Sequence, residues 1–134
     1  MSAALFEIQK AIYAKLTGDA VLMGKVAGVF DAVPPNQAYP YLVIGDATEV
    51  PWDLFGTLGN EITMTMHIWS RYAGFAEALN ILAEINRVLN RAALVLTGYN
   101  TFVCIYEWSE TLRDPDGITR HVPVRYRIIV ETLT

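Results

Sequence analysis

The chain has 134 residues, of which 53% are hydrophobic and 18% charged, and its formal net charge is −4. This size fits one domain spanning residues 1–134, and the composition excludes a disordered chain. The acidic balance argues against nucleic-acid binding as the main function, because such binding needs a dense basic face. The apolar fraction exceeds what a monomer of this size needs, which favours a buried surface between subunits.

Two sequence features bear on the compartment. The longest uncharged apolar runs are too short to span a bilayer, and no basic segment precedes an apolar stretch at the start of the chain. The single cysteine, Cys104, cannot form an internal disulfide, which favours the cytoplasm. Cys104 lies in an apolar strand pattern, where buried free cysteine is common, so we do not expect it to be catalytic.

The first third of the chain predicts two helices followed by strands. Apolar residues recur at helical spacing in the first segment: Leu5, Ile8, Ile12 and Leu16. Ser2 can cap the start of this helix, and Gly18 ends it. Asp19 can cap a second, short helix over residues 20–27. A short strand is expected over residues 28–33 and an apolar strand over residues 41–48.

Residues 51–60 predict a loop, because a proline opens the segment and two glycines and an asparagine close it. The loop nevertheless carries Trp52, Leu54 and Phe55. With turn residues at both ends and no strand period, little should hold it locally. Aromatic residues exposed on a loop are commonly buried by a partner, so these three are candidate interface residues. The alternative is that the loop folds back over its own sheet.

The second half of the chain predicts a strand, a helix and a long hairpin. Apolar and polar residues alternate strictly from Ile62 to Trp69, which is typical of a strand. A helix should follow over residues 74–92. Its apolar stripe is predicted to contain Phe75, Leu79, Leu82, Ile85 and Leu89. Strands over residues 102–113 and 118–133 flank the turn sequence DPDG, which is a strong hairpin signal.

This element order predicts an α+β fold: a mainly antiparallel sheet with helices packed on one face and a long C-terminal β-hairpin. The terminal hairpin should join the same sheet as the strand Ile62–Ile68, because both need the same helical cover. Pro123 lies inside a strand pattern and cannot donate to a ladder. Its position should therefore be an edge, a bulge or the end of a ladder.

No catalytic, cofactor or metal motif is present. The two histidines, His67 and His121, lie on different strands and on the presumed polar faces, without nearby ligands at metal-binding spacing. Arginines gather on the terminal hairpin at Arg113, Arg120, Arg125 and Arg127, of which the first three are the candidate site residues. They either form a solvated strand face that blunts a sheet edge or contact an acidic neighbour, and on the second reading they join the candidate interface.

The ordered set of segments resembles the tail completion, or tail terminator, proteins of long-tailed phages and phage-derived particles. The resemblance covers nearly the whole chain. It is carried by LFEIQKAIYAKLTGDAVLMGKVAGVFDAVPPNQAYPYLVIGD, by ITMTMHIWSR, by GFAEALNILAEINRVL and by DPDGITRHVPVRYRIIVE. No single segment is a chemical motif, and the specificity lies in their order.

The resemblance implies a structural virion protein and not an enzyme. Members of the family form a hexameric ring that caps the tail tube, stops its growth and offers a surface for joining to the head. The implied partners are copies of the same chain, the tail tube protein and a head–tail connector or neck protein, while DNA passes through without specific binding. The implied location is the virion tail or neck, after assembly in the host cytoplasm, with no membrane contact. The resemblance names no site residues.

Two other functions stay open from the residues alone. The first is a small intracellular binding module, in which the apolar loop closes over a ligand pocket. The second is an enzyme, which would need a nucleophile, acid or base within reach of its partners. No such group can be assembled from this sequence.

Overall fold

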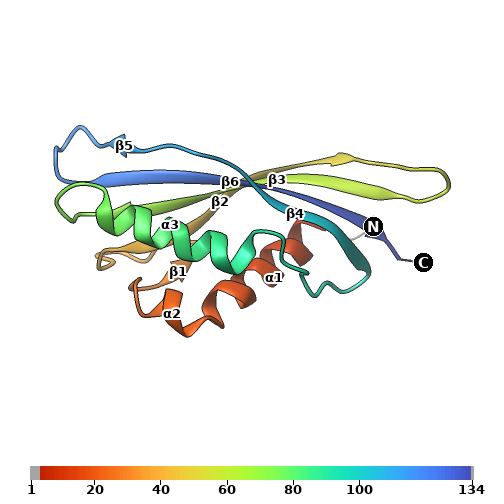
Figure 1. Ribbon diagram of the computed structural model, residues 1–134, viewed down its shortest axis with the longest axis horizontal. Coiled ribbons are helices and arrows are strands. Elements are labelled where there is room, and N and C mark those ends of the chain that lie inside the picture. The colour runs from red at the N-terminus through yellow and green to blue at the C-terminus, as the bar shows by residue number, and fades with distance from the viewer. Residues whose placement is uncertain (1–3, 134) are drawn as a thin grey trace.

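The computed structural model describes residues 4–133 (Figure 1). Its elements in chain order are α1 (Ala4–Thr17), α2 (Ala20–Met23), β1 (Val29–Phe30), β2 (Tyr41–Pro51), β3 (Gly59–Ser70), α3 (Ala76–Leu89), β4 (Tyr99–Ser109), β5 (Leu112–Arg113) and β6 (Arg120–Thr132). The Ser2 cap predicted for the first helix lies outside the described residues. Asp19 does cap α2, because its carboxylate accepts a hydrogen bond from the Leu22 amide at 2.9 Å.

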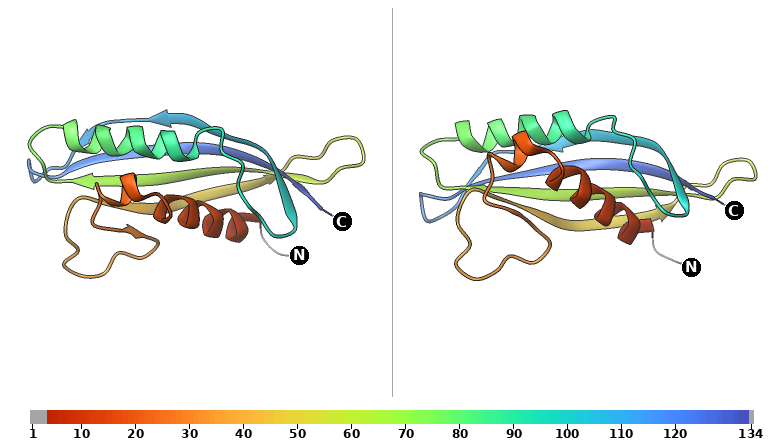
Figure 2. Two further views of the ribbon diagram at one scale, coloured as in Figure 1. Left: turned by 60° about the horizontal axis from the view of Figure 1, so that its bottom comes forward. Right: turned by 90° about the horizontal axis from the view of Figure 1, so that it is seen from below.

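The strands form one sheet in the order β1-β2-β3-β6-β4, with β5 also paired to β6. All pairings are antiparallel except the short one between β1 and β2. The helices lie on one face of this sheet and leave the other face without helical cover (Figure 2). The predicted α+β class is confirmed, and the terminal hairpin joins the sheet beside β3 as expected.

The core lies between the helices and the alternate residues of β3 and β6. On β3 the side chains that face the helices are fully or almost fully buried: Ile62, Met64, Met66 and Ile68. On β6 Tyr126 is also fully buried, and its hydroxyl donates to Asn86 Oδ1 of α3 at 2.6 Å. Burial raises the pKa of Tyr126, since the phenolate would lose its hydration. The predicted two-residue alternation of β3 is confirmed.

The core stripe of α3 differs from the predicted one. The buried residues are Ala78, Ile81, Ile85 and Leu89. Leu79 is exposed, and Phe75 and Leu82 are only partly buried. Apolar residues flank the true stripe on both sides, so helical periodicity alone predicted a stripe rotated away from the sheet. The small Ala78 faces the core, although the predicted stripe contains only large side chains.

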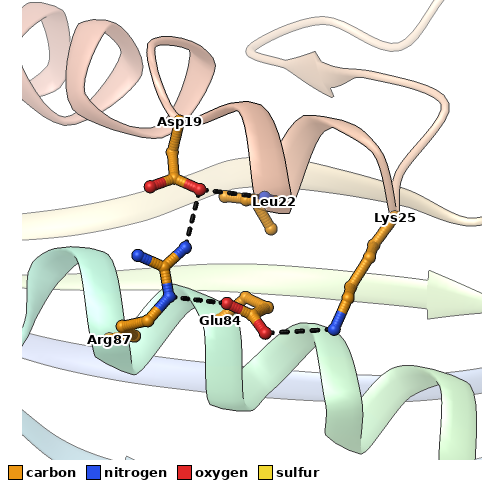
Figure 3. Close-up of polar contacts among 5 residues, drawn as sticks. All are labelled: Asp19, Leu22, Lys25, Glu84 and Arg87. Carbon is orange, nitrogen blue, oxygen red and sulfur yellow. Dashed lines mark hydrogen bonds and ion pairs between the residues drawn. The ribbon is translucent and has the colours of Figure 1, made fainter.

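Helices α2 and α3 are joined by a chain of ionic contacts on their exposed sides (Figure 3). Arg87 donates to Asp19 Oδ1 and to Glu84 Oε1, both at 2.7 Å, and Lys25 donates to Glu84 Oε2 at 3.0 Å. Arg87 holds the pKa values of both carboxyls below their ordinary values. Exposed ion pairs contribute little stability, so this network chiefly orients the short helix.

Pro123 occupies the end of a ladder, as predicted. The β4–β6 ladder stops at the pair Ser109–Val124, and the β5–β6 ladder begins at Leu112–His121. Pro123 falls between them, where its carbonyl accepts the Glu110 amide at 3.2 Å. Because its missing amide lies at this break, the proline is tolerated inside a central strand.

The corrected stripe gives a stability prediction. Replacing the fully buried Ile85 with alanine should destabilise the fold by about 2–5 kcal/mol, because it removes buried methyl groups and leaves a cavity. Leu79→Ala, on the exposed side of the same helix, should change the free energy of unfolding by less than about 1 kcal/mol. Urea denaturation of both variants measures the difference. Equal losses would show that the stripe is misplaced.

Candidate functional site

The apolar segment predicted as a loop is the tip of the β2–β3 hairpin. Strand β2 continues to Pro51, three residues beyond its predicted end, and β3 begins at Gly59. Only residues 52–58, here called the hairpin tip, lie outside the two strands. The tip extends past the end of the sheet and past the helices, at the far right of Figure 1. The candidate interface residues therefore lie on a short turn that extends beyond the last paired residues of the sheet, such as Gly59 and Glu131.

Local hydrogen bonds hold this tip in place, contrary to the expectation that little would. The Trp52 amide donates to the Gly59 carbonyl at 2.9 Å, and the Gly59 amide donates to Asp53 Oδ1 at 3.1 Å. Leu54 and Thr57 form an antiparallel bridge around a two-residue turn. The second turn residue is Gly56, whose φ of +74° is a conformation that glycine adopts without strain.

Trp52 turns back onto its own subunit. Its ring packs edge-to-face on Phe102 of β4, with 6.2 Å between ring centroids. The backbone of the tip passes so close to Gly59 that a Cβ atom at that position would collide with the carbonyl oxygens of Trp52 and Val130. For this residue the alternative reading, in which the segment folds over its own sheet, describes the structure. Trp52 anchors the tip and is only partly exposed.

The other apolar residues of the tip point to solvent. Phe55 is fully exposed, and Leu58 and Leu54 are 62% and 47% exposed. An ordered turn that presents three large apolar side chains to water, with no covering element among residues 4–133, is typical of a contact surface. The tip therefore divides into an anchor, Trp52, and an exposed apolar set made of Leu54, Phe55 and Leu58.

The structure does not bring the predicted arginines to the hairpin tip. Arg113 and Arg120 lie at the opposite end of the sheet, where β5 pairs with the start of β6. Both guanidinium groups contact the same ring, with their central carbons 5.1 and 5.7 Å from the ring centroid of Phe75. Arg120 also donates to the Ile118 carbonyl at 3.0 Å. Arg120 thus supports the hairpin turn of its own subunit, and Arg113 contacts the residue that precedes α3.

Arg125 lies farther along β6, on the face without helices. It forms an ion pair with Glu107 at 2.8 Å, and its guanidinium lies 5.1 Å from the ring centroid of Trp108. Arg120 and Arg125 do not blunt a sheet edge, since β6 is paired on both sides, whereas Arg113 lies on the edge strand β5, which pairs only with β6. Each of the three arginines has a partner within its own chain. Contact with an acidic neighbour in another subunit stays a prediction.

The structure gives no support for a catalytic role of Cys104 or for a metal site. Cys104 is buried as expected, its thiol donates to the Leu89 carbonyl at 3.4 Å, and burial raises its pKa to about 12. A thiol with such a pKa is protonated at neutral pH and is a poor nucleophile. Among residues 4–133, no group of three or more His, Cys, Asp or Glu residues could hold a metal ion.

Comparison with known proteins places these features in a family. The family model for the tail completion protein gp17 matches residues 10–131. The chain belongs to the tail completion protein gp17 family. Among relatives, the tail completion protein gp17 of Bacillus phage SPP1 is 28% identical over 123 residues, which are 92% of this chain and 91% of that protein.

Two solved structures resemble this family member closely. A chain from the virion of a native gene transfer agent particle has a TM-score of 0.88 at 26% identity, covering 98% of this chain and 99% of its own. The structure of the SPP1 gp17 protein has a TM-score of 0.64 at 28% identity, covering 98% of this chain and 91% of its own. The resemblance to tail completion proteins drawn from the sequence is therefore confirmed.

The family assignment fixes the class of function. This chain is a structural tail completion protein of a phage or gene transfer agent particle, a component of the virion tail, and not an enzyme. None of the helices within residues 4–133 has the length and apolar character needed to cross a bilayer.

The predicted site was incomplete by two residues. Leu58, an apolar residue of the same loop that was not counted in the interface, is the second most exposed residue of the tip's apolar set. Phe102, the partner of Trp52, lies in a bulge of β4 between the pairs of Thr101 and Val103. A contact between residues 50 positions apart depends on the sheet order, which periodicity cannot supply.

The division of the tip gives a prediction for the isolated subunit. Trp52→Ala should lower the free energy of unfolding by about 1 kcal/mol or more, because it removes buried ring area and an aromatic pair. Phe55→Ala should leave it unchanged within about 0.5 kcal/mol, since the ring touches nothing in its own chain. Thermal and urea melts of the two variants test this contrast. A destabilised Phe55→Ala variant would mean that the ring belongs to the subunit core.

Proposed function

We propose that this protein forms a ring, most simply a hexamer, that caps the end of the tail tube, terminates its growth and provides the surface for joining to the head. The observation that carries the proposal is the exposed apolar set Leu54, Phe55 and Leu58 on an ordered, projecting hairpin tip. Burying one such side chain contributes about 1.5–3 kcal/mol. Because the turn is already ordered by hydrogen bonds, little of this energy is lost to fixing its backbone.

A projecting tip suits the geometry of a ring. In a ring each subunit offers one surface to the neighbour on its left and a different surface to the neighbour on its right. An arm that extends beyond its own sheet and helices can reach a neighbouring subunit or the end of the tube (Figure 1). The chain from a virion particle agrees with this structure at a TM-score of 0.88, which supports a conformation suited to assembly.

The proposed partners follow from the same reading. They are further copies of this chain, the tail tube protein and a head–tail connector or neck protein.

The alternative function, a binding module whose apolar loop closes over a ligand, is less well supported. The tip points away from the body of the molecule instead of covering a cavity (Figure 1).

Phe55 gives the most direct test by mutation. Phe55→Ala should fold normally and yet lose ring formation or the capping of purified tail tubes, because it removes the largest exposed apolar side chain of the tip. Size-exclusion chromatography with light scattering measures ring formation, and tube-length distributions in electron micrographs measure capping.

Phe6→Ala is the matched control. Phe6 is 60% exposed on α1, so the same substitution removes the same side chain from a different surface. The control should assemble and cap like the wild type. If Phe55→Ala folds and caps normally while the control does too, the tip is not the assembly surface.

DNA should pass through the proposed ring without specific binding. Each subunit carries a formal charge of −4, so a ring of identical subunits is acidic and its central passage should repel phosphates on average. We expect no binding of duplex DNA with micromolar affinity at physiological salt, measured by fluorescence anisotropy. Micromolar affinity that weakens steeply with salt would contradict this part of the proposal.

A further inference from the structure

The only two histidines of the chain meet on the face of the sheet that has no helices. His67 of β3 and His121 of β6 are both partly buried, and His67 Nδ1 lies 2.7 Å from His121 Nε2. The ring of His121 is also stacked on Trp69, with 3.9 Å between centroids and 7° between planes. The three rings form a compact cluster that links the two central strands through their side chains.

The backbone confines this cluster from the side of β2. At the bulge of β2, a Cβ atom on Gly45 would lie 2.7 Å from Cδ2 and 2.8 Å from Nε2 of the His67 ring. Only a glycine leaves room for the ring in this position. The close approach holds His67 against His121 and prevents the ring from swinging toward β2.

The hydrogen bond restricts the protonation of both rings. One nitrogen of the contact must carry a proton and the other must present a lone pair. If His67 Nδ1 donates, His121 carries its own proton on Nδ1; if His121 Nε2 donates, His67 carries its proton on Nε2. In both cases the two neutral rings share the same tautomer. Mixed tautomers would set two lone pairs or two protons against each other at 2.7 Å.

The contact tolerates one added proton and not two. A single imidazolium still donates to the neutral ring opposite, and the charged donor strengthens the bond. When both rings are protonated, two N–H groups and two positive charges face each other, and the bond cannot form. We propose that His67 and His121 form an acid-sensitive latch between β3 and β6, which stays closed while the pair carries at most one added proton and opens when both rings are protonated.

Charged groups around the latch influence the pKa values of the two histidines. The titratable or charged side chains around the pair on this side of the sheet include Tyr41, Asp46, Arg71, Glu107, Asp114 and Arg125. Glu61 and Arg127 lie farther along the same face of β3 and β6, where they pair with each other. Asp46 favours the charged form of His67, and Asp114 favours that of His121. Arg125 and Glu107 pair with each other, and the Tyr41 pKa of about 12 keeps it neutral.

Burial outweighs these carboxylates and lowers the pKa of both histidines, and the charge of His67 lowers that of His121 further. The folded chain therefore binds protons more weakly here than the unfolded chain does. The latch should be closed at and above the ordinary histidine pKa of about 6.5, and it should open only where the second proton binds, below that value.

Long-range ¹H–¹⁵N NMR of the imidazole rings tests the proposal on the whole chain. At pH 8 the two rings should show the same tautomer. On acidification they should titrate in two coupled steps, the second below the ordinary value, and the Trp69 indole signal should move with the second step. In His67→Gln, the pKa of His121 should rise, because a neighbouring positive charge is removed.

Thr65→Val is the control, since Thr65 is the next residue on the same face of β3 and does not titrate. It should leave both histidine titrations unchanged. Different tautomers for the two rings at pH 8 would overturn the proposal, and so would independent titration with the same His121 pKa in the wild type and in His67→Gln. The tautomers are read from the wild-type chain, so the result stands even if His67→Gln fails to fold.

Discussion

Strand β6 is paired on both of its sides, with β3 along one edge and with β4 and β5 along the other, and the layers of the molecule follow from this constraint. Its alternate side chains point to the helices and are buried, which fixes the face that α1 and α3 must cover. The remaining side chains of β6 and β3 point to the opposite face. That face stays without helices, and the histidine cluster and the Arg125–Glu107 pair lie there.

The hairpin tip has its role because the β2–β3 arm is longer than the helical layer that covers the sheet (Figure 1). Residues 52–58 extend beyond the last sheet pairs, Gly59–Glu131 and Tyr99–Thr132, where a short turn has little to pack on. Trp52 stabilises this turn within the subunit by packing on Phe102 of β4. Phe55 has no such contact among residues 4–133 and is left fully exposed. A single short segment thus combines an internal anchor with an external contact surface.

Sequence periodicity predicted the parts of the fold that depend on local pattern. The alternation from Ile62 to Ile68 placed β3 correctly, and the DPDG turn placed the terminal hairpin. The rotation of α3 was predicted less well, because apolar residues such as Leu79 flank the core stripe and the small Ala78 gave a weak signal. Local pattern fixes the type of element more securely than the face that it buries.

The candidate site depended on information that is not local. The sequence singled out Trp52 and Phe55 together, and only the sheet order separates an anchor from an exposed residue. The sequence placed His67 and His121 on different strands and gave no reason to join them. Their contact follows from the register of β3 and β6, in which Trp69 pairs with His121 and His67 with Pro123.

The central claim is that the exposed residues of the hairpin tip are buried when the protein caps a tail. A cryo-electron microscopy reconstruction of the protein bound to purified tail tubes measures this directly, because it places every copy of Phe55. The account predicts a closed ring in which each Phe55 lies in a contact with a neighbouring subunit or with the tube. A capped tube in which Phe55 and its neighbours Leu54 and Leu58 stay in solvent in every copy would contradict it.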